Sequence, residues 1–217
     1  EISACLVGSE MCIRDRKNGL TLEILEQLTY KSKMERSLVN SLRKFDKEEL
    51  FCEVREILHF YQSCSLLDEV DLDYRIKSED SCRRKYNKFY PEMRLEKTFN
   101  DLLGFRMLTD NYETITKGEI SAEFRIVDMS RGKSGDDGYR GVHIYYQPDH
   151  RHYPIEIQVN SYYDRQMNNW LHKYLYKKGY PDSVGNQLRQ QYECGTIRRE
   201  QEFEEVLKLV LSGSEKI

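Results

Sequence analysis

Hydrophobic residues in the first third of the chain recur at intervals of three and four, the spacing of an amphipathic helix. The pattern begins at Leu20 and continues to Tyr61. It is interrupted near Phe45-Asp46-Lys47, where an aspartate precedes a new apolar run. We therefore predict two or three helices in an N-terminal segment that we place at residues 17–66.

The middle of the chain alternates apolar and polar residues, which is typical of half-buried strands. Ser78, followed by two acidic residues, predicts the start of a helix that runs through Tyr86. The last two strands are separated only by a polar turn, so we expect them to form a hairpin. The five predicted strands lie at about residues 70–76, 105–108, 124–127, 142–147 and 153–159.

Two further features complete the predicted elements. A segment rich in glycine, serine and aspartate predicts a loop at 132–138. Helical spacing returns at 162–178, and one or two more helices are expected between Pro181 and Leu211.

Strands mixed with helices predict an α+β fold, with a mixed, roughly five-stranded sheet and helices packed on it. We place the core at residues 67–180 and C-terminal helices at 181–217. Residues 1–16 do not fit this pattern, and we expect them to be non-native or disordered.

Composition narrows the function classes. The 217-residue chain has a net charge of −3, which argues against a domain whose main task is to coat a nucleic-acid backbone. No run of about 18 apolar residues occurs, so we expect no membrane span. The six cysteines form no Cys-x-x-Cys pair and no cluster with zinc spacing. Such scattered cysteines favour reduced thiols and a cytoplasmic location.

A block of basic residues stands at the start of the predicted helix after Ser78. Ser81 and Lys85 are four residues apart and share a helix face, while Lys77 and Arg75 precede the helix on one side of a strand. A helix N-terminus adds free N–H groups and a positive dipole end. The four side chains are thus spaced to converge on a triphosphate. The alternative is a solvated basic helix face.

Two carboxylates stand at neighbouring predicted strands. Asp101 precedes one strand, and Glu156 alternates with isoleucines inside another, so its side chain points away from them. Mg²⁺ commonly takes one or two protein carboxylates together with phosphate oxygens. This pair therefore predicts a magnesium site, although Glu156 alone could equally be a solvent-facing strand acid.

An aromatic residue follows the predicted loop. Tyr139 comes directly after Gly138, where its ring can offer a stacking face to a nucleobase, an interaction of about 1–3 kcal/mol. The alternative is an ordinary half-buried strand tyrosine. His143 is expected on the same strand face as Tyr139, where a histidine is usually structural.

Taken together, these blocks resemble the synthetase domain of the RelA/SpoT family, enzymes that make the alarmones ppGpp and pppGpp. The resemblance covers roughly residues 72–178 and rests on four ordered motifs and a helix with His172-Lys173 and Tyr176-Lys177. The motifs are Arg75-x-Lys77-x-x-x-Ser81-x-x-x-Lys85, Asp101-x-x-Gly104-x-Arg106, Gly138-Tyr139-Arg140-x-x-His143 and Glu156-Ile157-Gln158.

The resemblance implies a nucleotidyltransferase-like synthetase fold that transfers the β,γ-pyrophosphoryl group of ATP to the 3′-hydroxyl of GDP or GTP. Asp101 and Glu156 would be the catalytic residues and would bind Mg²⁺, with Glu156 at the acceptor hydroxyl. ATP and its phosphates would be bound by Arg75, Lys77, Ser81, Lys85 and Arg106. The acceptor would be bound by Tyr139, Arg140, His143 and Gln158.

Three departures from the family pattern leave the acceptor open. Asn160-Ser161 replace the usual Arg-Thr, Leu171 replaces the glutamate before the helix histidine, and the loop from Lys133 to Asp137 is unusually acidic. A relative that modifies the 3′ end of tRNA is therefore the first alternative, and an inactive nucleotide-binding regulator is the second. No His-Asp dipeptide occurs, so we assign no alarmone hydrolase. A homo-oligomer is compatible with the sequence.

Overall fold

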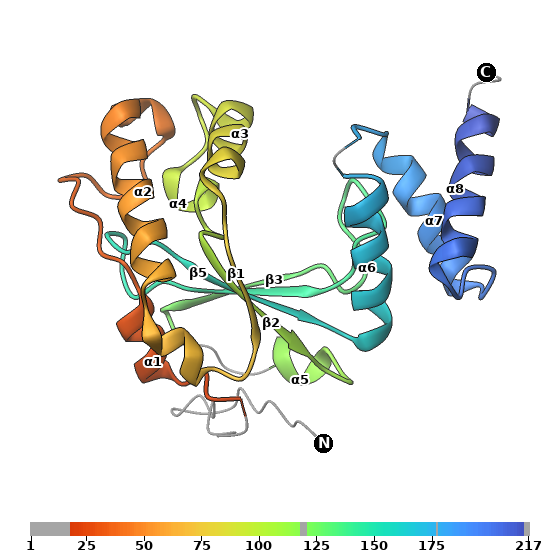
Figure 1. Cartoon of the computed structure of the whole chain (residues 1–217), viewed down its shortest axis with the longest axis horizontal. Helices are drawn as coiled ribbons and strands as arrows, with labels where there is room; N and C mark the ends of the chain where they lie inside the picture. Colours follow the sequence, from red (N-terminus) through yellow and green to blue (C-terminus); the bar gives the residue numbers. More distant parts are fainter. Residues whose placement is uncertain (1–17, 118–120, 177, 215–217) are drawn as a thin grey trace. The chain divides into compact units, whose positions relative to one another are not determined.

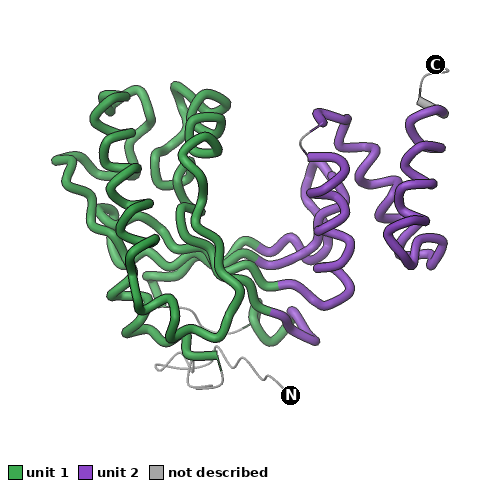
Figure 2. The backbone as a smooth tube through the Cα atoms, in the orientation of Figure 1, with its two compact units in different colours: residues 1–107, 113–127, 143–159 green, residues 108–112, 128–142, 160–217 purple. Residues whose placement is uncertain are grey.

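A computed structural model of the chain describes residues 18–117, 121–176 and 178–214 (Figure 1). The segment 1–16, expected to be non-native or disordered, lies outside these ranges. The chain divides into two compact units, which are described separately (Figure 2). The first unit comprises residues 1–107, 113–127 and 143–159, and the second comprises 108–112, 128–142 and 160–217.

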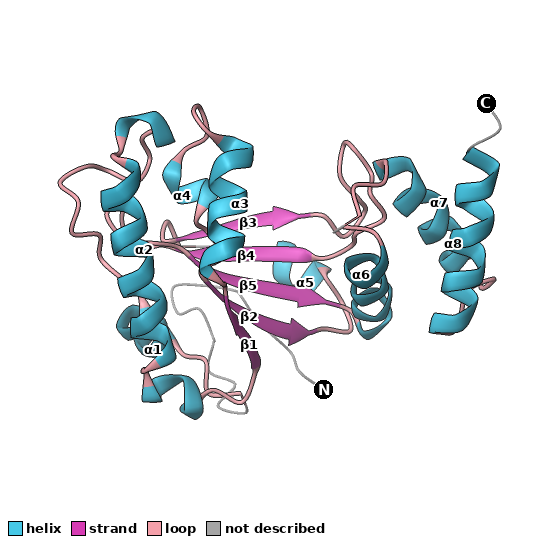
Figure 3. Cartoon of the chain, turned by 45° about the horizontal axis from the view of Figure 1, so that its top comes forward, coloured by secondary structure: helices cyan, strands magenta, loops and turns pink. Residues whose placement is uncertain are grey.

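The first unit is built on the predicted five-stranded sheet, whose strand order is β1-β2-β5-β4-β3. β1 pairs antiparallel with β2, whereas β2 and β5 run in the same direction, so the sheet is mixed as expected (Figure 3). The strands are β1 Asp73–Ile76, β2 Leu103–Leu108, β3 Phe124–Asp128, β4 Val142–Tyr146 and β5 Ile155–Asn160.

The two faces of this sheet differ in character because side chains alternate along each strand. One face is apolar and buried, and burying each of its large side chains contributes roughly 1.5–3 kcal/mol. Its members include Phe105, Phe124, Ile144, Ile155 and Ile157. The opposite face, called the polar face below, carries five candidate site residues, Arg75, Arg106, His143, Glu156 and Gln158.

Local signals explain where the helices of the first unit begin. The side chain of Asp46 accepts hydrogen bonds from two backbone N–H groups at the start of α2, so the predicted interruption is a helix cap. Ser78 caps α3 in the same way, as predicted. The helices are α1 Leu22–Leu28, α2 Lys47–Gln62, α3 Glu79–Phe89, α4 Leu95–Thr98 and α5 Glu113–Thr116, with 3-10 turns at Leu42–Lys44 and Ser65–Glu69.

Residues 30–40 form no helix, although their hydrophobic spacing is helical. The buried carboxylate of Glu53 on α2 explains this difference, since it accepts hydrogen bonds from the backbone N–H groups of Lys33 and Met34 at 2.7 and 3.3 Å. It also binds the hydroxyl of Tyr153 at 2.8 Å. These bonds satisfy backbone N–H groups outside any helix, so tertiary contacts override the local pattern.

The second unit consists mainly of helices α6 Tyr162–Tyr174, α7 Asp182–Glu193 and α8 Glu200–Ser214. They share a core that includes Trp170, Leu171, Leu188 and Phe203. The segment between β3 and β4 is a loop, as predicted for 132–138, whereas α6 ends four residues before the predicted Lys178. Among the described helices of both units, none has the length and apolarity needed to cross a bilayer.

Candidate active site

Two lysines of the basic block meet at Asp101 in the first unit. The Nζ of Lys77 hydrogen-bonds Oδ2 of Asp101, and the Nζ of Lys85 lies 3.0 Å from Oδ1. Burial alone would raise the pKa of Asp101, but the two ammonium groups and their hydrogen bonds outweigh it and hold that pKa below its usual value. The carboxylate is therefore ionised at neutral pH.

Backbone register brings these three residues together. The N–H of Lys77 donates to the carbonyl of Leu102 at 2.9 Å, which fixes the end of β1 beside the residue after Asp101. Lys85 lies on α3, whose first turn is set by the Ser78 cap. The predicted convergence of Lys77 and Lys85 thus has a geometric basis, with a carboxylate at its centre.

The other members of the basic block lie around this group. Arg75 is exposed and stands opposite Gly104 in the β1–β2 register, while Arg106 stands opposite Asp73. The hydroxyl of Ser81 contacts that of Ser78 at 2.9 Å and accepts from the guanidinium of Arg84 at 3.0 Å. Ser81 is thus part of the first turn of α3.

Glu156 lies on the polar face of β5 and is buried, with a relative exposure of 6%. Its Oε1 accepts from the hydroxyl of Tyr145 at 3.1 Å and lies 3.0 Å from Nδ1 of His143. Its Oε2 accepts from the amide of Gln158 at 2.9 Å. Because polar groups surround this carboxylate, Glu156 is not the solvent-facing acid of the alternative interpretation.

Gly104 on the adjoining strand β2 leaves room beside Glu156. A Cβ atom at Gly104 would lie 3.5 Å from Oε2 of Glu156, in van der Waals contact with the carboxylate. A methyl group there would shield one side of this oxygen. The glycine of the Asp101-x-x-Gly104 motif therefore lies directly beside the carboxylate of Glu156 and places no side-chain atom against it.

Tyr145 is one of the polar residues around the Glu156 carboxylate, and no prediction from the sequence included it. Burial raises the pKa of Tyr145 well above its usual value, and the nearby Glu156 carboxylate raises it further. Its phenol therefore stays protonated and donates to Glu156. The guanidinium of Arg125 on β3 lies 4.2 Å from the Tyr145 ring centroid. The available signal was the period of two from His143, which places Tyr145 on the same strand face.

The carboxylates of Asp101 and Glu156 are the kind of oxygen ligand that Mg²⁺ prefers. Asp101 accepts from two lysines and Glu156 from a phenol and an amide, which leaves acceptor capacity on both, since a carboxylate has about four lone-pair sites. Within the described ranges, no cluster of three or more His, Cys, Asp or Glu side chains is arranged to hold a metal ion. Any Mg²⁺ would therefore need phosphate oxygens as further ligands.

The predicted acceptor residues Tyr139 and Arg140 belong to the loop before β4, in the second unit. Gly138 has a φ of 85°, so the chain turns there, and Tyr139 lies before the strand rather than on the strand face of His143. The Nζ of Lys133 lies 5.1 Å from the centroid of the Tyr139 ring. This tyrosine is thus presented by a loop.

The side chain of Arg140 is paired within the same loop. Its Nη1 and Nη2 donate to the two carboxylate oxygens of Asp136 at 2.7 and 2.9 Å. The hydrogen bond from Arg140 holds the pKa of Asp136 below its usual value. The unusually acidic loop thus neutralises one of the predicted acceptor-binding cations.

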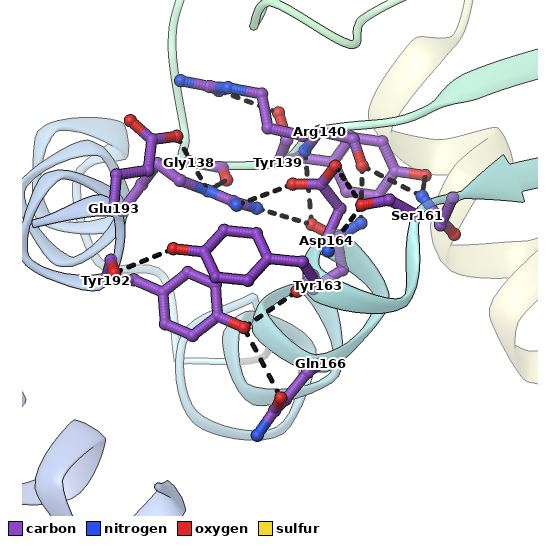
Figure 4. A network of polar contacts seen from close by, with 12 residues as sticks. Gly138, Tyr139, Arg140, Ser161, Tyr163, Asp164, Gln166, Tyr192 and Glu193 are labelled. Carbon is purple, nitrogen blue, oxygen red and sulfur yellow. Dashed lines mark hydrogen bonds and ion pairs between the residues drawn. The ribbon is translucent and has the colours of Figure 1, made fainter. Parts of the chain in front are cut away.

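Two other departures from the family pattern have structural roles in the second unit. The amide of Asn160 donates to the carbonyl of Arg140 at 2.9 Å. Ser161 caps α6, and its hydroxyl also donates to Asp164 at 2.7 Å, as Figure 4 shows. Leu171 is a core residue of α6. Asn160 thus supports the loop that carries Tyr139, whereas Ser161 stabilises the start of α6.

The helix motif after β5 is only partly described. The ring of His172 lies edge-on to that of Tyr176, with centroids 6.3 Å apart. Lys173 pairs with Glu200 of α8 at 2.7 Å. Lys177 lies outside the described residues.

Comparison with solved structures finds proteins of the family that the motifs resemble. Small alarmone synthetase 1 from Bacillus subtilis, bound to its product pppGpp, matches with a TM-score of 0.43 and 19% identity, over 78% of this chain and 92% of that one. Small alarmone synthetase 2 from the same organism matches with a TM-score of 0.42 and 17% identity, over 80% and 100%.

A GTP pyrophosphokinase family protein from Streptococcus pneumoniae also matches, with a TM-score of 0.39 and 18% identity, over 90% of this chain and 97% of that one. No model of a known protein family and no curated protein matches the chain.

Proposed function

We propose that this protein is a small alarmone synthetase, which transfers the β,γ-pyrophosphoryl group of ATP to the 3′-hydroxyl of GDP or GTP and releases AMP. The observation that carries the proposal is a pair of carboxylates, one in the turn just before β2 and the other on the adjoining strand β5. Glu156 is buried among three polar side chains, and Asp101 is held by two lysines.

The donor side is the group formed by Lys77, Lys85 and Asp101. Transfer of a phosphoryl or pyrophosphoryl group depends mostly on positioning and on neutralising charge, so lysines beside the donor phosphates supply much of what the reaction needs. Arg75 is exposed on the strand that Lys77 follows, where it can reach an adenine or a phosphate. Arg106 is assigned to the same side by its motif.

The acceptor hydroxyl is assigned to Glu156. The 3′-oxygen forms a bond to the β-phosphorus, the bond from that phosphorus to the α,β-bridging oxygen breaks, and AMP leaves with the bridging oxygen. The proton of the hydroxyl passes to the carboxylate of Glu156. Tyr145 holds that carboxylate by a hydrogen bond, and His143 contacts both side chains at 3.0 and 3.2 Å.

We assign Mg²⁺ to Asp101 and Glu156. When bound, such an ion would neutralise charge on the transferred phosphates. The residual acceptor capacity of the two carboxylates supports this assignment, and the lysines at Asp101 would then share the phosphate oxygens with the ion.

The acceptor base is assigned to Tyr139, through its ring face. Tyr139→Ala should raise the Michaelis constant for GDP or GTP far more than that for ATP, because only the acceptor loses its stacking partner. Tyr139→Phe should be nearly silent, since it keeps the ring. Unaltered guanine-nucleotide kinetics in Tyr139→Ala would remove the stacking role.

The ion pair between Asp136 and Arg140 favours a second candidate, transfer to the 3′ end of tRNA. An arginine neutralised by an aspartate offers less to the 5′-phosphates of a free nucleotide than an unpaired one, and a tRNA 3′ end carries no such phosphates. The net charge of −3 weighs against this candidate, because binding tRNA favours a basic surface.

One experiment separates these acceptors. The protein is incubated with γ-labelled ATP and Mg²⁺ together with GDP, GTP or deacylated tRNA in separate reactions. We expect label in a guanine nucleotide and release of AMP. Label only in RNA would favour the second candidate, and no transfer to any acceptor would leave a nucleotide-binding regulator.

A further inference from the structure

Helix α7 lies against the backbone of the loop that carries Tyr139. A Cβ atom on Gly185 of α7 would lie 2.0 Å from the carbonyl oxygen of Asp137. A Cβ atom on Gly138 would lie 2.3 Å from the carbonyl oxygen of Gly185. Both distances are far shorter than any real contact, so loop and helix can meet here only because both positions are glycine.

Arg189 stands one helical turn after Gly185 and is fully buried. Its Nε donates to the carbonyl of Gly138 at 2.7 Å, and its Nη1 lies 2.8 Å from Oδ1 of Asp164. Figure 4 shows Gly138 and Asp164 joined in this polar network. A buried guanidinium needs such partners, and here one of them is the backbone of the loop.

Asn168 of α6 joins this network to the backbone of Arg140, the residue after Tyr139. Its Oδ1 accepts from Nη2 of Arg189 at 3.2 Å and from the N–H of Arg140 at 3.2 Å. Its amide donates to the carbonyl of Arg140 at 2.7 Å. The backbone is therefore held on both sides of Tyr139, by Arg189 at Gly138 and by Asn168 at Arg140.

The position of α7 is itself fixed against α6. The rings of Tyr163 on α6 and Tyr192 on α7 are stacked with centroids 4.1 Å apart. Each hydroxyl donates to the backbone carbonyl of the other residue, at 2.8 and 3.0 Å, and both rings are labelled in Figure 4. The helix that supports the loop is therefore itself held by a ring stack and two hydrogen bonds.

We propose that α7 is a positioning element for the acceptor, with Gly185 and Arg189 as positioning residues that set Tyr139 for stacking. This inference rests on the proposed function, since it requires that Tyr139 contacts the acceptor. Neither residue is assigned any contact with substrate. Their effect passes through the loop backbone at Asp137 and Gly138.

Gly185→Ala is the sharpest test in the full-length protein. Alanine is a better helix former than glycine, so α7 itself should not be weakened, whereas the new methyl group would displace the loop. We expect the Michaelis constant for the guanine nucleotide to rise about tenfold or more, the equivalent of one or more lost hydrogen bonds, with that for ATP unchanged. The matched control is Gln187→Ala, at an exposed position of the same helix.

Hydrogen exchange gives a readout that does not depend on catalysis. Amides of the loop 130–142 should exchange about tenfold faster in Gly185→Ala than in the control, because the loop loses its support. The double variant Arg189→Met with Asp164→Asn removes the buried charge pair as a whole and should have the same two effects. Arg199→Met, an exposed arginine paired with Glu202, is its control.

The outcomes separate the inference from the proposed function. Unchanged loop exchange in both variants would overturn the inference, and so would faster exchange with unchanged acceptor kinetics. An equal rise in the Michaelis constants for ATP and for the acceptor would also overturn it. If the wild-type protein modifies no guanine nucleotide, the proposed function fails and the acceptor role with it, whereas loop exchange still decides whether α7 supports the loop.

Discussion

The carboxylate of Asp136 holds the guanidinium of Arg140 through two hydrogen bonds, of 2.7 and 2.9 Å, four residues apart in one loop. A two-point pair of this kind uses the geometry with which an arginine also binds a phosphate. If Arg140 binds an acceptor phosphate, as we propose, that phosphate must compete with Asp136 for the guanidinium. The pair would then limit how strongly this loop attracts an anionic acceptor.

Asp136→Asn should strengthen binding of GDP and GTP because it frees the charge of Arg140. We expect the Michaelis constant for GTP to fall several-fold, the equivalent of about 1 kcal/mol for a partly exposed ion pair, with little change for ATP. Steady-state kinetics at low salt measure this. Glu92→Gln, which removes an exposed ion pair with Arg43, is the control. A rise in the GTP constant would show that Asp136 supports the loop and does not compete with the acceptor.

Tyr145→Phe should slow transfer while the fold is kept, because only the hydroxyl that binds Glu156 is lost. We expect turnover to fall about tenfold, the usual scale of one hydrogen bond to a charged group. Steady-state kinetics with saturating ATP and GTP measure this turnover.

The control for this variant is Tyr146→Phe, on the opposite face of β4, where burial raises the pKa of the tyrosine to about 12. A turnover in Tyr145→Phe equal to that of the wild type would remove Tyr145 from the support of Glu156.

Glu156→Gln should abolish transfer and leave ATP binding largely intact. The substitution keeps the size of the side chain but removes the charge that would take up the proton of the acceptor hydroxyl. Transfer is measured with labelled ATP, and ATP affinity by calorimetry. Glu205→Gln, at an exposed position of α8, is the control. Equal activity in Glu156→Gln would exclude it from the mechanism.

Lys77→Ala and Lys85→Ala should each weaken ATP binding by about 1–3 kcal/mol, the scale of one charge-assisted phosphate contact. Each lysine stands at Asp101, so the two losses should not add simply. Calorimetry with ATP and Mg²⁺ measures both. Lys88→Ala at an exposed position of α3 serves as the control. If both variants bind ATP as the wild type does, the basic block is only a solvated surface.

Asp101 should make the stability of the protein depend on pH at the acid end. Its folded-state pKa is depressed despite burial, because the ammonium groups of Lys85 and Lys77 favour the ionised form. The unfolded chain thus binds a proton first, at a pKa of about 3.9. The contribution of Asp101 to stability is present above that pH and is lost as the pH falls through the lower folded-state value.

Thermal unfolding between roughly pH 2 and 6 measures this contribution, in a range that brackets the carboxylate pKa. Asp101→Asn should flatten the acid part of the stability curve, even if the variant is less stable at neutral pH because Lys77 and Lys85 lose their partner. If the stability of Asp101→Asn falls with decreasing pH as steeply as that of the wild type, other carboxylates account for the loss.

The parts of the fold that local chemistry determines could be predicted from the sequence. Asp46 and Ser78 cap helices because a short polar side chain before an acidic first turn satisfies the free N–H groups. The alternation of Glu156 with isoleucines likewise predicted that its side chain lies on the face of the sheet opposite theirs. The sheet and its five strands followed from the same period.

The parts that depend on tertiary contacts could not be predicted. The helical spacing after Tyr30 gave no sign that the carboxylate of Glu53 would bind backbone N–H groups of this segment and leave it non-helical. Tyr145 was one of 16 tyrosines, and only the pairing of β4 with β5 places its hydroxyl at Glu156. Arg189 belongs to no motif, and its partners lie 21 to 51 residues away in the sequence.

The contact between Gly138 and Gly185 has a consequence for how such chains diverge. A side chain on Gly138 would collide with the carbonyl of Gly185, and a side chain on Gly185 would collide with the carbonyl of Asp137. Neither glycine can therefore be replaced unless the backbone moves. The two positions are therefore expected to change together or not at all. A relative that keeps the Gly-Tyr-Arg motif but has a larger residue at the α7 position should present its aromatic ring differently, and this one pair would mark the difference where the motif does not.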